Sequence, residues 1–318
     1  MLRPKLYVSR LLPEAVMAVI AARFQLLNHP TPDPPSPVEL AQGLIEADAA
    51  ICTLTESITA ELLAQAPRLR ILANCAVGYN NIDLAAARAR GVVITNTPDV
   101  LTDATADLTW ALMLAVARRI TEGDRLARSG AWTGWEPTQL LGADVAGATL
   151  GIVGMGRIGQ AVARRAEGFG MRILYASRRP VSTGGSAAWQ PCDLDSLLGQ
   201  ADFLSLHVPL SAETRRLIGA PQLHRMKPSA YLINTSRGPI VDEEALVAAL
   251  QAGRPAGAGL DVYEQEPLIH PGLRALPNVV LLPHLGSATA TTRMRMGMMC
   301  VENILAVWDG RPAPNQVA

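Results

Sequence analysis

The sequence predicts an α/β fold of two Rossmann-like or flavodoxin-like parallel-sheet domains, with the second domain inserted in a discontinuous first domain. A short apolar run, a glycine-rich turn, a helix-compatible segment and a second apolar run succeed one another over residues 148–175. Residues 1–100 also alternate between strand-like runs and helix-compatible segments, so a folded unit precedes that turn. At 318 residues, the chain is long for one hydrophobic core and suits two domains.

The N-terminal part predicts a small parallel α/β domain with flavodoxin-like alternation. Five prolines between His29 and Pro37 indicate a loop, and Ser36, Ser57 and Asp83 can each cap the helix that follows. The expected strands are 6–8, 24–27, 49–52, 70–74 and 92–95. The expected helices are 13–22, 38–47, 58–66 and 84–90.

The middle of the chain predicts one long helix over residues 102–127, which should bridge the two domains. Residues 129–147 show no clear period and contain Trp132 and Trp135, so this arm should pack on its own domain or reach a partner subunit. A last helix over 288–308 should return to the first domain. Further strands are expected at 148–153, 171–175, 203–207, 230–234, 257–262 and 279–282.

The glycine-rich turn is Gly154-Met155-Gly156-Arg157-Ile158-Gly159, and its flanking strand and helix make it a dinucleotide-binding unit. Its glycines allow a tight turn, a close approach to a pyrophosphate and close packing of the helix on the sheet. The helix N-terminus offers N–H groups and a partial positive charge to the phosphates. Cofactor contacts are expected at Gly154, Gly156, Arg157, Ile158 and Gly159.

The end of the second strand of this unit predicts which cofactor is used. In NAD-binding units an Asp or Glu near this point bonds the ribose diol, whereas this strand ends in Tyr175-Ala176-Ser177-Arg178-Arg179-Pro180. The guanidinium group of arginine binds a 2′-phosphate through charge-assisted hydrogen bonds of about 1.5–3 kcal/mol each. We therefore expect Ser177, Arg178 and Arg179 to favour NADPH (NADP) over NADH (NAD). The alternative is that both arginines are solvated and either cofactor is used.

These elements set the expected domain boundaries. A first domain of residues 1–98 and 289–318 should hold the substrate. The dinucleotide-binding domain should span residues 99–288 and include both the bridging helix and a dimerisation arm.

Residues downstream of the glycine-rich turn suit the reduction of a 2-keto acid. This reaction needs a cation for the carboxylate, a polarised carbonyl and an acid that gives up a proton near neutral pH. Arg237 follows a predicted strand at the edge where α/β sheets bind ligands. Its guanidinium group can bind a carboxylate and approach the keto oxygen. A structural ion pair is the alternative for Arg237.

A histidine could supply the proton. His284 follows a predicted strand, and His207 also stands at a strand end and competes with it. The other three histidines, His29, His224 and His270, lie in loop or surface-helix segments and are expected to be solvated.

A carboxylate beside His284 would hold the ring in one tautomer and favour its imidazolium form. Glu264 and Glu266 both lie just past the strand that ends in Asp261-Val262. Spacing alone does not choose between them, and a solvated acidic loop is the alternative for both.

These segments resemble the D-isomer-specific 2-hydroxyacid dehydrogenases and, within that family, the glyoxylate/hydroxypyruvate reductases. The resemblance covers nearly the whole chain. It is carried by segments 76–83, 96–102, 154–159, 234–238, 259–263, 266–267 and 283–287, which read AVGYNNID, NTPDVLT, GMGRIG, NTSRG, GLDVY, EP and PHLGS.

The resemblance implies three catalytic residues. Arg237 would bind the substrate, Glu266 would pair with the acid, and His284 would donate the proton. The resemblance selects Glu266 rather than Glu264 because Glu266 directly precedes a proline.

The resemblance also implies contacts from other parts of the chain. The N–H groups of Val77 and Gly78 would bind the substrate carboxylate from the other domain. Asp261 would bond the nicotinamide amide, and Thr105 would face the cofactor from the bridging helix. Further cofactor contacts are expected at Val208, Pro209, Thr214, Thr235, Ser236 and Gly286.

Two features favour the glyoxylate/hydroxypyruvate branch. One is the segment Ser177–Arg179, and the other is the segment 131–137, which reads AWTGWEP. In this branch a tryptophan of this arm would reach the partner's active site and contact the substrate, and Trp135 is the candidate. A tryptophan that only packs in the dimer is the alternative. The expected activity is NADP-preferring reduction of glyoxylate or hydroxypyruvate to the D-2-hydroxy acid by a homodimer.

The composition excludes several other functions. With 49% hydrophobic residues, 18% charged residues and a formal net charge of zero, the chain is typical of soluble globular proteins and unsuited to nucleic acid or an anionic membrane. No apolar run approaches the ~20 residues of a membrane span, and the N-terminus lacks the features of a signal peptide. The four cysteines show no metal-ligand spacing, so we expect free thiols, no metal site and a cytoplasmic protein.

Several related functions are alternatives. Another D-2-hydroxyacid dehydrogenase or a phosphite dehydrogenase would use a similar scaffold, whereas formate dehydrogenases pair the histidine with glutamine. Phosphoglycerate dehydrogenases usually carry an acid after the second strand. A non-enzymatic NAD(H)-binding protein resembling the C-terminal binding protein corepressors could retain all three catalytic residues. No peptide-docking feature and no long tail after the last helix is evident, so we favour an enzyme.

Overall fold

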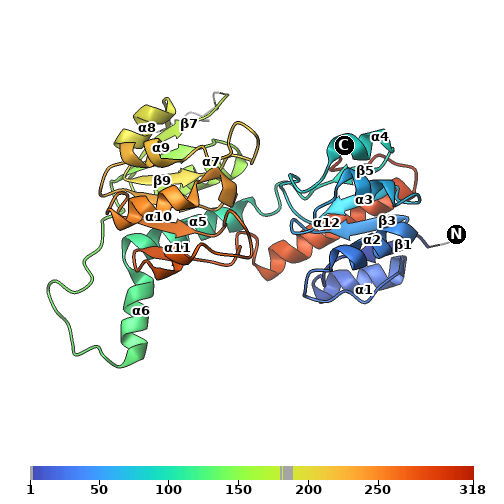
Figure 1. Ribbon diagram of the computed structural model, residues 1–318, viewed down its shortest axis with the longest axis horizontal. Coiled ribbons are helices and arrows are strands. Elements are labelled where there is room, and N and C mark those ends of the chain that lie inside the picture. The colour runs from blue at the N-terminus through green and yellow to red at the C-terminus, as the bar shows by residue number, and fades with distance from the viewer. Residues whose placement is uncertain (1–2, 180, 182–188) are drawn as a thin grey trace. The chain divides into compact units, whose positions relative to one another are not determined.

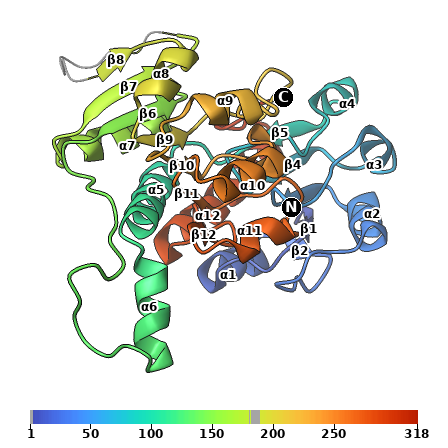
Figure 2. The same ribbon diagram turned by 60° about the vertical axis from the view of Figure 1, so that its left-hand side comes forward.

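The computed structural model describes residues 3–179, 181 and 189–318, which form two compact units. The first unit contains the described residues up to Leu101 together with Ser287–Ala318, and the second unit spans Thr102–Gly286. Each unit is built on its own parallel sheet (Figure 1, Figure 2). The predicted fold class is therefore confirmed, because the second unit interrupts the first and the C-terminal helix returns to the first.

The first unit contains a five-stranded parallel sheet in the order β2-β1-β3-β4-β5. Its short strands are almost entirely buried, as is typical of parallel sheets that are covered on both faces. The strands are β1 (Lys5–Val8), β2 (Gln25–Leu26), β3 (Ala49–Cys52), β4 (Ile71–Asn74) and β5 (Val93–Thr95).

Helices cover both faces of this sheet. Neighbouring strand residues point to opposite faces, so each face has its own hydrophobic core. Helices α1 (Glu14–Arg23) and α12 (Ala290–Trp308) pack on one face, and the long α12 lies with the first unit in Figure 1. Helices α2 (Pro37–Glu46), α3 (Ala60–Ala64) and α4 (Leu84–Ala89) pack on the other.

Two of the three predicted helix caps in this unit are present. Ser36 accepts the N–H of Glu39, and Asp83 accepts the N–H of Ala86. The prediction that Ser57 caps a helix over 58–66 is wrong, because Thr59 caps the shorter α3. Ile58 stays extended because it pairs as a parallel bridge with Ile82, a tertiary contact that local sequence does not encode.

The second unit contains a seven-stranded parallel sheet in the order β12-β11-β10-β9-β6-β7-β8. Six of these strands match predicted runs, whereas the edge strand β8 was not expected because its three residues are too few to show a period. The strands are β6 (Thr149–Val153), β7 (Arg172–Ala176), β8 (Trp189–Pro191), β9 (Phe203–Leu206), β10 (Tyr231–Asn234), β11 (Gly257–Leu260) and β12 (Val279–Leu281).

Helices also cover both faces of the larger sheet. Helices α5 (Thr102–Ala117) and α7 (Arg157–Glu167) pack on one face around a core that includes Trp110. The other face carries α8 (Leu194–Gln200), α9 (Ala220–Arg225), α10 (Glu243–Gln251) and α11 (Pro271–Ala275). The sheet edge at the ends of β6 and β9 is where the order of the strands reverses, which is where such sheets bind ligands.

The prediction of one helix over 102–127 is wrong. The chain forms α5 and then a separate helix, α6 (Ile120–Ser129), and the break falls at Arg119, which has a left-handed φ of 54°. In a continuing helix the Ala117 carbonyl would accept a backbone N–H from the next turn. It instead accepts the N–H of Ala143 at 2.8 Å. The break is therefore set by the returning chain and not by a helix-breaking residue.

The arm over 130–147 has no regular structure. In both views, α6 and this arm extend away from the sheet of their own unit (Figure 1, Figure 2). Trp132 is 55% exposed and Trp135 is 80% exposed, so neither ring is buried within this chain. Within the described residues, no helix is long and apolar enough to cross a membrane.

Candidate active site

The carboxyl edge of the seven-stranded sheet collects most of the predicted site residues. All seven strands are parallel, so the loops that follow them leave the sheet at the same edge. The predicted residues in these loops, or in the first turn of α7 that follows the first of them, are Gly154, Gly156, Arg157, Ile158, Gly159, Ser177, Arg178, Arg179, Val208, Pro209, Thr214, Thr235, Ser236, Arg237, Asp261, Glu266, His284 and Gly286.

The turn after β6 has the shape that a pyrophosphate requires. Gly154 has a φ of 96°, and a Cβ atom there would lie 2.7 Å from the carbonyl carbon of His207. Gly159 packs so closely on the Gly154 carbonyl that a side chain does not fit. At Gly156, by contrast, a Cβ atom would meet no described atom within 4 Å, and no side chain caps the start of α7. Open space above a helix N-terminus fits a dinucleotide.

The end of β7 presents cations and no carboxylate. Ser177, Arg178 and Arg179 are all exposed, and Pro180 lies outside the described residues. The hydrogen bond from Ser211 lowers the pKa of Glu213, and the charge of Arg178 adds to this effect. The charge of Arg178 therefore acts on the segment that follows β9.

Four hydroxyl groups among the predicted cofactor contacts hold the loops of this edge in place. Thr105 donates to the Gly286 carbonyl at 3.0 Å, and the hydroxyl of Thr235 lies 2.8 Å from that of Thr109. Two further bonds run from Ser236 to the Val208 carbonyl and from Thr214 to the Pro209 carbonyl. These groups shape the loops that a cofactor would meet.

His284 and Glu266 form a hydrogen-bonded pair. Nδ1 of His284 lies 2.8 Å from Oε2 of Glu266, and both side chains are about three-quarters buried, at 25% and 27% exposure. Burial acts to raise the pKa of Glu266, but the hydrogen bond and charge of His284 outweigh it and lower the pKa. Glu266 is therefore ionised at neutral pH and leaves Nε2 of His284 as the ring nitrogen available to a ligand.

The loop that carries His284 is anchored by Asp261. The Asp261 carboxylate accepts the N–H of Leu285 at 2.6 Å and that of Gly286 at 2.8 Å, and its carbonyl accepts the N–H of His284 at 3.0 Å. Burial raises the pKa of Asp261, although these two backbone donors oppose the increase. The anchor holds His284 at a φ of 54°, a conformation that a residue with a side chain rarely adopts.

Tyr263 and Glu243 hold the two loops in place, and sequence reasoning missed both. The Tyr263 hydroxyl donates to the Leu282 carbonyl at 2.8 Å and so links the loop of Glu266 to the segment between β12 and His284. Glu243 is buried, which raises its pKa, and it accepts the N–H of Glu264 at 2.6 Å. A tyrosine and a glutamate in ordinary sequence positions carry no local signal of this role.

The two competing residues have other partners. Glu264 pairs with Arg216 at 3.2 Å, so the structure brings Glu266 to the histidine. The ring of His207 lies 2.8 Å from the Ser205 hydroxyl, and burial lowers the pKa of His207 to about 4. His207 is therefore uncharged at neutral pH and has no proton to give as an imidazolium.

Arg237 lies in the loop after β10. Burial lowers the pKa of Arg237, while the negative charge of Glu266 acts in the opposite direction, and the guanidinium remains a cation. Its Nη1 donates to the Ser236 carbonyl at 2.7 Å. The next residue, Gly238, runs against the main chain of Tyr263 and leaves no room for a side chain.

Val77 and Gly78 lie in the first unit, in the loop after β4. Nδ2 of Asn96 donates to the Val77 carbonyl at 2.8 Å, and Nδ2 of Asn74 donates to the Gly78 carbonyl at 2.8 Å. The Val77 carbonyl shares a planar peptide with the Gly78 N–H, so Asn96 fixes the direction of that N–H. Both asparagines are buried at the ends of strands, Asn74 in β4 and Asn96 after β5. An asparagine at the end of an apolar run was the sequence signal that could have identified these two positioning residues.

Trp135 does not lie at the carboxyl edge. It belongs to the arm after α6, where its ring is 80% exposed. Trp135 is not part of the hydrophobic core around α5 and α7.

Comparison with known proteins gives consistent matches. A family model described as the NAD binding domain of D-isomer specific 2-hydroxyacid dehydrogenases matches residues 110–286. A glyoxylate reductase from Thermococcus litoralis is 48% identical over 321 residues, which cover 99% of this chain and 97% of that protein. A glyoxylate reductase from Korarchaeum cryptofilum is 49% identical over 319 residues, which cover 99% and 96% of the two chains.

Two crystal structures extend the comparison. A protein from Thermus thermophilus matches with a TM-score of 0.93 and 47% identity, covering 99% of this chain and 100% of that one. An NADPH-dependent glyoxylate/hydroxypyruvate reductase from Sinorhizobium meliloti, in complex with NADP and malonate, matches with a TM-score of 0.87 and 35% identity, covering 99% and 97%.

Proposed function

The chain belongs to the D-isomer specific 2-hydroxyacid dehydrogenase family, and from this premise we propose that it reduces glyoxylate or hydroxypyruvate to the 2-hydroxy acid, with the D configuration where the product is chiral. The observation that carries this proposal is the 2.8 Å pair between His284 and Glu266, at the same sheet edge as Arg237. The names of the relatives support small 2-keto acids as the substrate class.

The proposed reaction divides its tasks among these side chains. The chemistry that a bound nicotinamide cofactor supplies is hydride transfer to the carbonyl carbon. Arg237 binds the substrate carboxylate and polarises the carbonyl. His284 donates the proton from Nε2 to the carbonyl oxygen, while ionised Glu266 stabilises the imidazolium through Nδ1.

NADPH is the proposed cofactor in preference to NADH. Ser177, Arg178 and Arg179 are exposed at the end of β7, where NAD-binding units carry a carboxylate. The match to an NADPH-dependent reductase crystallised with NADP supports this choice. The other predicted contacts, at Thr105, Thr214, Thr235, Asp261 and their neighbours, would line the remainder of the cofactor.

A cytoplasmic homodimer completes the proposal. The exposed rings of Trp132 and Trp135 offer an apolar surface that a second copy of the chain would cover, and Trp135 would reach the partner's substrate. Free thiols at all four cysteines suit a reducing compartment. Sedimentation equilibrium of the wild type and of Trp135→Ala would test the dimer and the role of its ring.

Initial rates of NADPH and NADH consumption against a panel of 2-keto acids test the activity. We expect glyoxylate and hydroxypyruvate to be reduced, with a higher kcat/KM for NADPH. A protein that binds the cofactor but reduces no 2-keto acid would instead support the corepressor-like alternative. Reduction of NADP by phosphite would support the phosphite dehydrogenase alternative, and a clear preference for NADH would remove the assigned role of the arginines.

A further inference from the structure

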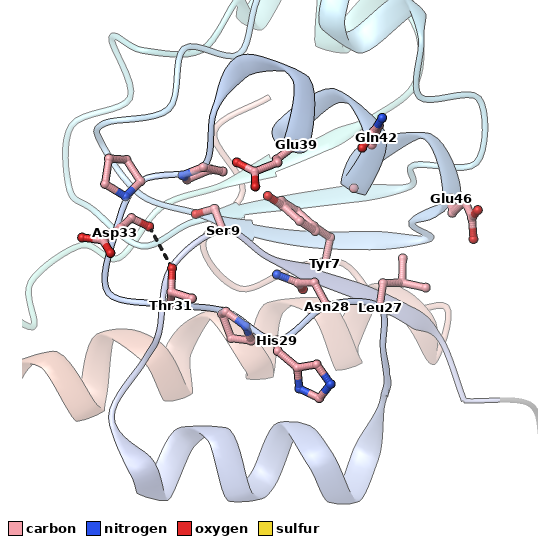
Figure 3. Close-up of a pocket in the computed structure, with 14 residues that line it drawn as sticks. Tyr7, Ser9, Leu27, Asn28, His29, Thr31, Asp33, Glu39, Gln42 and Glu46 are labelled. Carbon is pink, nitrogen blue, oxygen red and sulfur yellow. Dashed lines mark hydrogen bonds between the residues drawn. The ribbon is translucent and has the colours of Figure 1, made fainter.

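A surface cavity of about 590 Å³ lies in the first unit, along α2 (Figure 3). Its floor is β1 and the residue that follows it, Ser9, and the proline-rich segment 28–35 borders it on the side away from α2. The volume is within the range of small-molecule sites. Strand β1 also lies where the strand order of this sheet reverses, and open parallel sheets bind ligands beside such strands.

Tyr7 is a buried polar side chain that has no partner in this cavity. The residue is 4% exposed, and its ring packs on Gly43, where a side chain would not fit. Its hydroxyl forms no hydrogen bond with any residue that the structure describes, and Figure 3 shows it directed toward Glu39. The hydroxyl itself still reaches the cavity, where it is free to form a hydrogen bond with a ligand.

The Tyr7 hydroxyl is protonated over the whole physiological range. Burial is the main cause that raises the pKa of Tyr7 to about 12, and the negative charges of Glu56 and, to a smaller extent, Glu39 add to it. A neutral phenol can accept a hydrogen bond from a ligand cation through its oxygen. Deprotonation of Tyr7 therefore does not interfere with such a contact.

Three carboxylates of the described residues line the cavity, and Glu39 is the one toward which the Tyr7 hydroxyl points (Figure 3). Asp33, Glu39 and Glu46 all line the cavity, and hydrogen bonds from Ser36 lower the pKa of Glu39. Ser36 occupies only Oε2 of Glu39, through its N–H and its hydroxyl at 2.8 Å each, which leaves Oε1 for a ligand.

Few positive charges balance these carboxylates. Lys5 lies 3.9 Å from Glu46 but does not line the cavity, and among the described lining residues His29 is the one basic side chain. In the described part of the chain, neither Asp33 nor Glu39 forms an ion pair. The cavity therefore favours a cationic ligand.

A metal ion does not fit this cavity. Among the described residues, no three His, Cys, Asp or Glu side chains are arranged to hold a metal ion. The space is also far larger than a hydrated ion needs, and Leu27 and the prolines supply apolar surface beside the carboxylates. An organic cation uses both the charged and the apolar parts of the lining.

We propose that this cavity binds a small organic cation, an amine or a guanidinium compound on a short aliphatic chain. Its N–H groups donate to Oε1 of Glu39 and to the hydroxyl oxygen of Tyr7, and its aliphatic part lies along the proline-rich segment. This site is separate from the residues assigned to 2-keto acid reduction, so the two proposals succeed or fail independently.

Isothermal titration calorimetry of the full-length protein tests the site with agmatine and 1,4-diaminobutane as probes. We expect saturable binding of one cation per chain, and no binding of 1,4-butanediol or succinate, which match the chain length without the positive charge. Tyr7→Phe and Glu39→Gln should each weaken binding at least about tenfold, because each removes one hydrogen bond to the cation. Glutamine can still complete the α2 capping box, so Glu39→Gln should fold.

Glu61→Gln is the matched control, because Glu61 also lies in the first turn of a helix of this unit but does not line the cavity. Its affinity for both cations should equal that of the wild type. Equal affinity in the Tyr7 and Glu39 variants would overturn the proposal, and so would the absence of saturable binding by either cation. Binding of succinate or butanediol with similar affinity would overturn the assignment to cations. Should Glu39→Gln unfold, Tyr7→Phe alone decides the outcome.

Discussion

The main chain of Gly238 packs against the main chain of Tyr263 with no space for a side chain between them. Gly238 directly follows Arg237, and Tyr263 lies three residues before Glu266. The contact therefore sets the distance between the loop that would bind the substrate and the loop that holds the histidine's partner. Glycine at 238 is needed for packing, and its backbone conformation does not require it.

Gly238→Ala should lower kcat/KM for the 2-keto acid about 100-fold, because the added methyl group forces the two loops apart by about an ångström or more. The affinity for NADPH, measured by fluorescence titration, should change little. Gly199→Ala in α8, where a methyl group meets no described atom, is the control and should retain full activity. Normal activity in Gly238→Ala would show that the close packing does not position Arg237.

His284→Ala should lower kcat about 10²–10⁴-fold, because the carbonyl oxygen loses its proton donor. Stopped-flow or fluorescence measurements should show nearly unchanged NADPH binding. His224→Ala in α9 is the control. If turnover of His284→Ala equals that of the wild type, the proton comes from another group.

Glu266→Gln should make stability less dependent on pH. His284 lowers the pKa of Glu266 despite burial, so the folded state gains stability at pH values above the unfolded pKa and loses it as the pH falls through the lowered folded pKa. At pH 7 we expect the variant to be less stable by about 1 kcal/mol, and the difference should disappear in acid. Urea unfolding at several pH values measures this, with exposed Glu244→Gln as the control. A constant difference across the pH range would contradict the assignment.

Arg237→Lys should raise KM for the 2-keto acid at least about tenfold, because an ammonium group cannot form the planar bidentate contact with a carboxylate. Steady-state kinetics at saturating NADPH provide the measurement. Arg225→Lys changes an exposed arginine of α9 in the same way and should leave KM unchanged. A wild-type KM for Arg237→Lys would place the substrate carboxylate elsewhere.

Replacing both Arg178 and Arg179 with Gln should reduce kcat/KM with NADPH at least about tenfold and leave kcat/KM with NADH nearly unchanged, because only NADPH carries the 2′-phosphate. Arg164→Gln on the exposed side of α7 serves as the control. A parallel loss with both cofactors would indicate damage to the fold and not a lost phosphate contact.

Much of the architecture could be predicted because its signals are local. Strand β3 matches the expected residues 49–52, and Ser36 and Asp83 cap their helices, since burial runs and capping depend on a few neighbouring residues. The break at Arg119 and the shift of the cap to Thr59 could not be predicted. Both are imposed by contacts with Ala143 and Ile82, which lie more than twenty residues away in the sequence.

In the candidate site, too, some features follow from the local sequence and others depend on contacts between distant segments. The sequence alone determined the strand–turn–helix unit at Gly154–Gly159 and the presence of arginine, glutamate and histidine just beyond strand ends, because motif and position are properties of the linear chain. Only the tertiary structure decided between Glu264 and Glu266, which their spacing alone had left open. It also decided the neutral state of His207, the anchoring of the His284 loop by Asp261, and the cavity over Tyr7. Each depends on distance and desolvation between segments far apart in the chain, and these quantities exist only once the chain is packed.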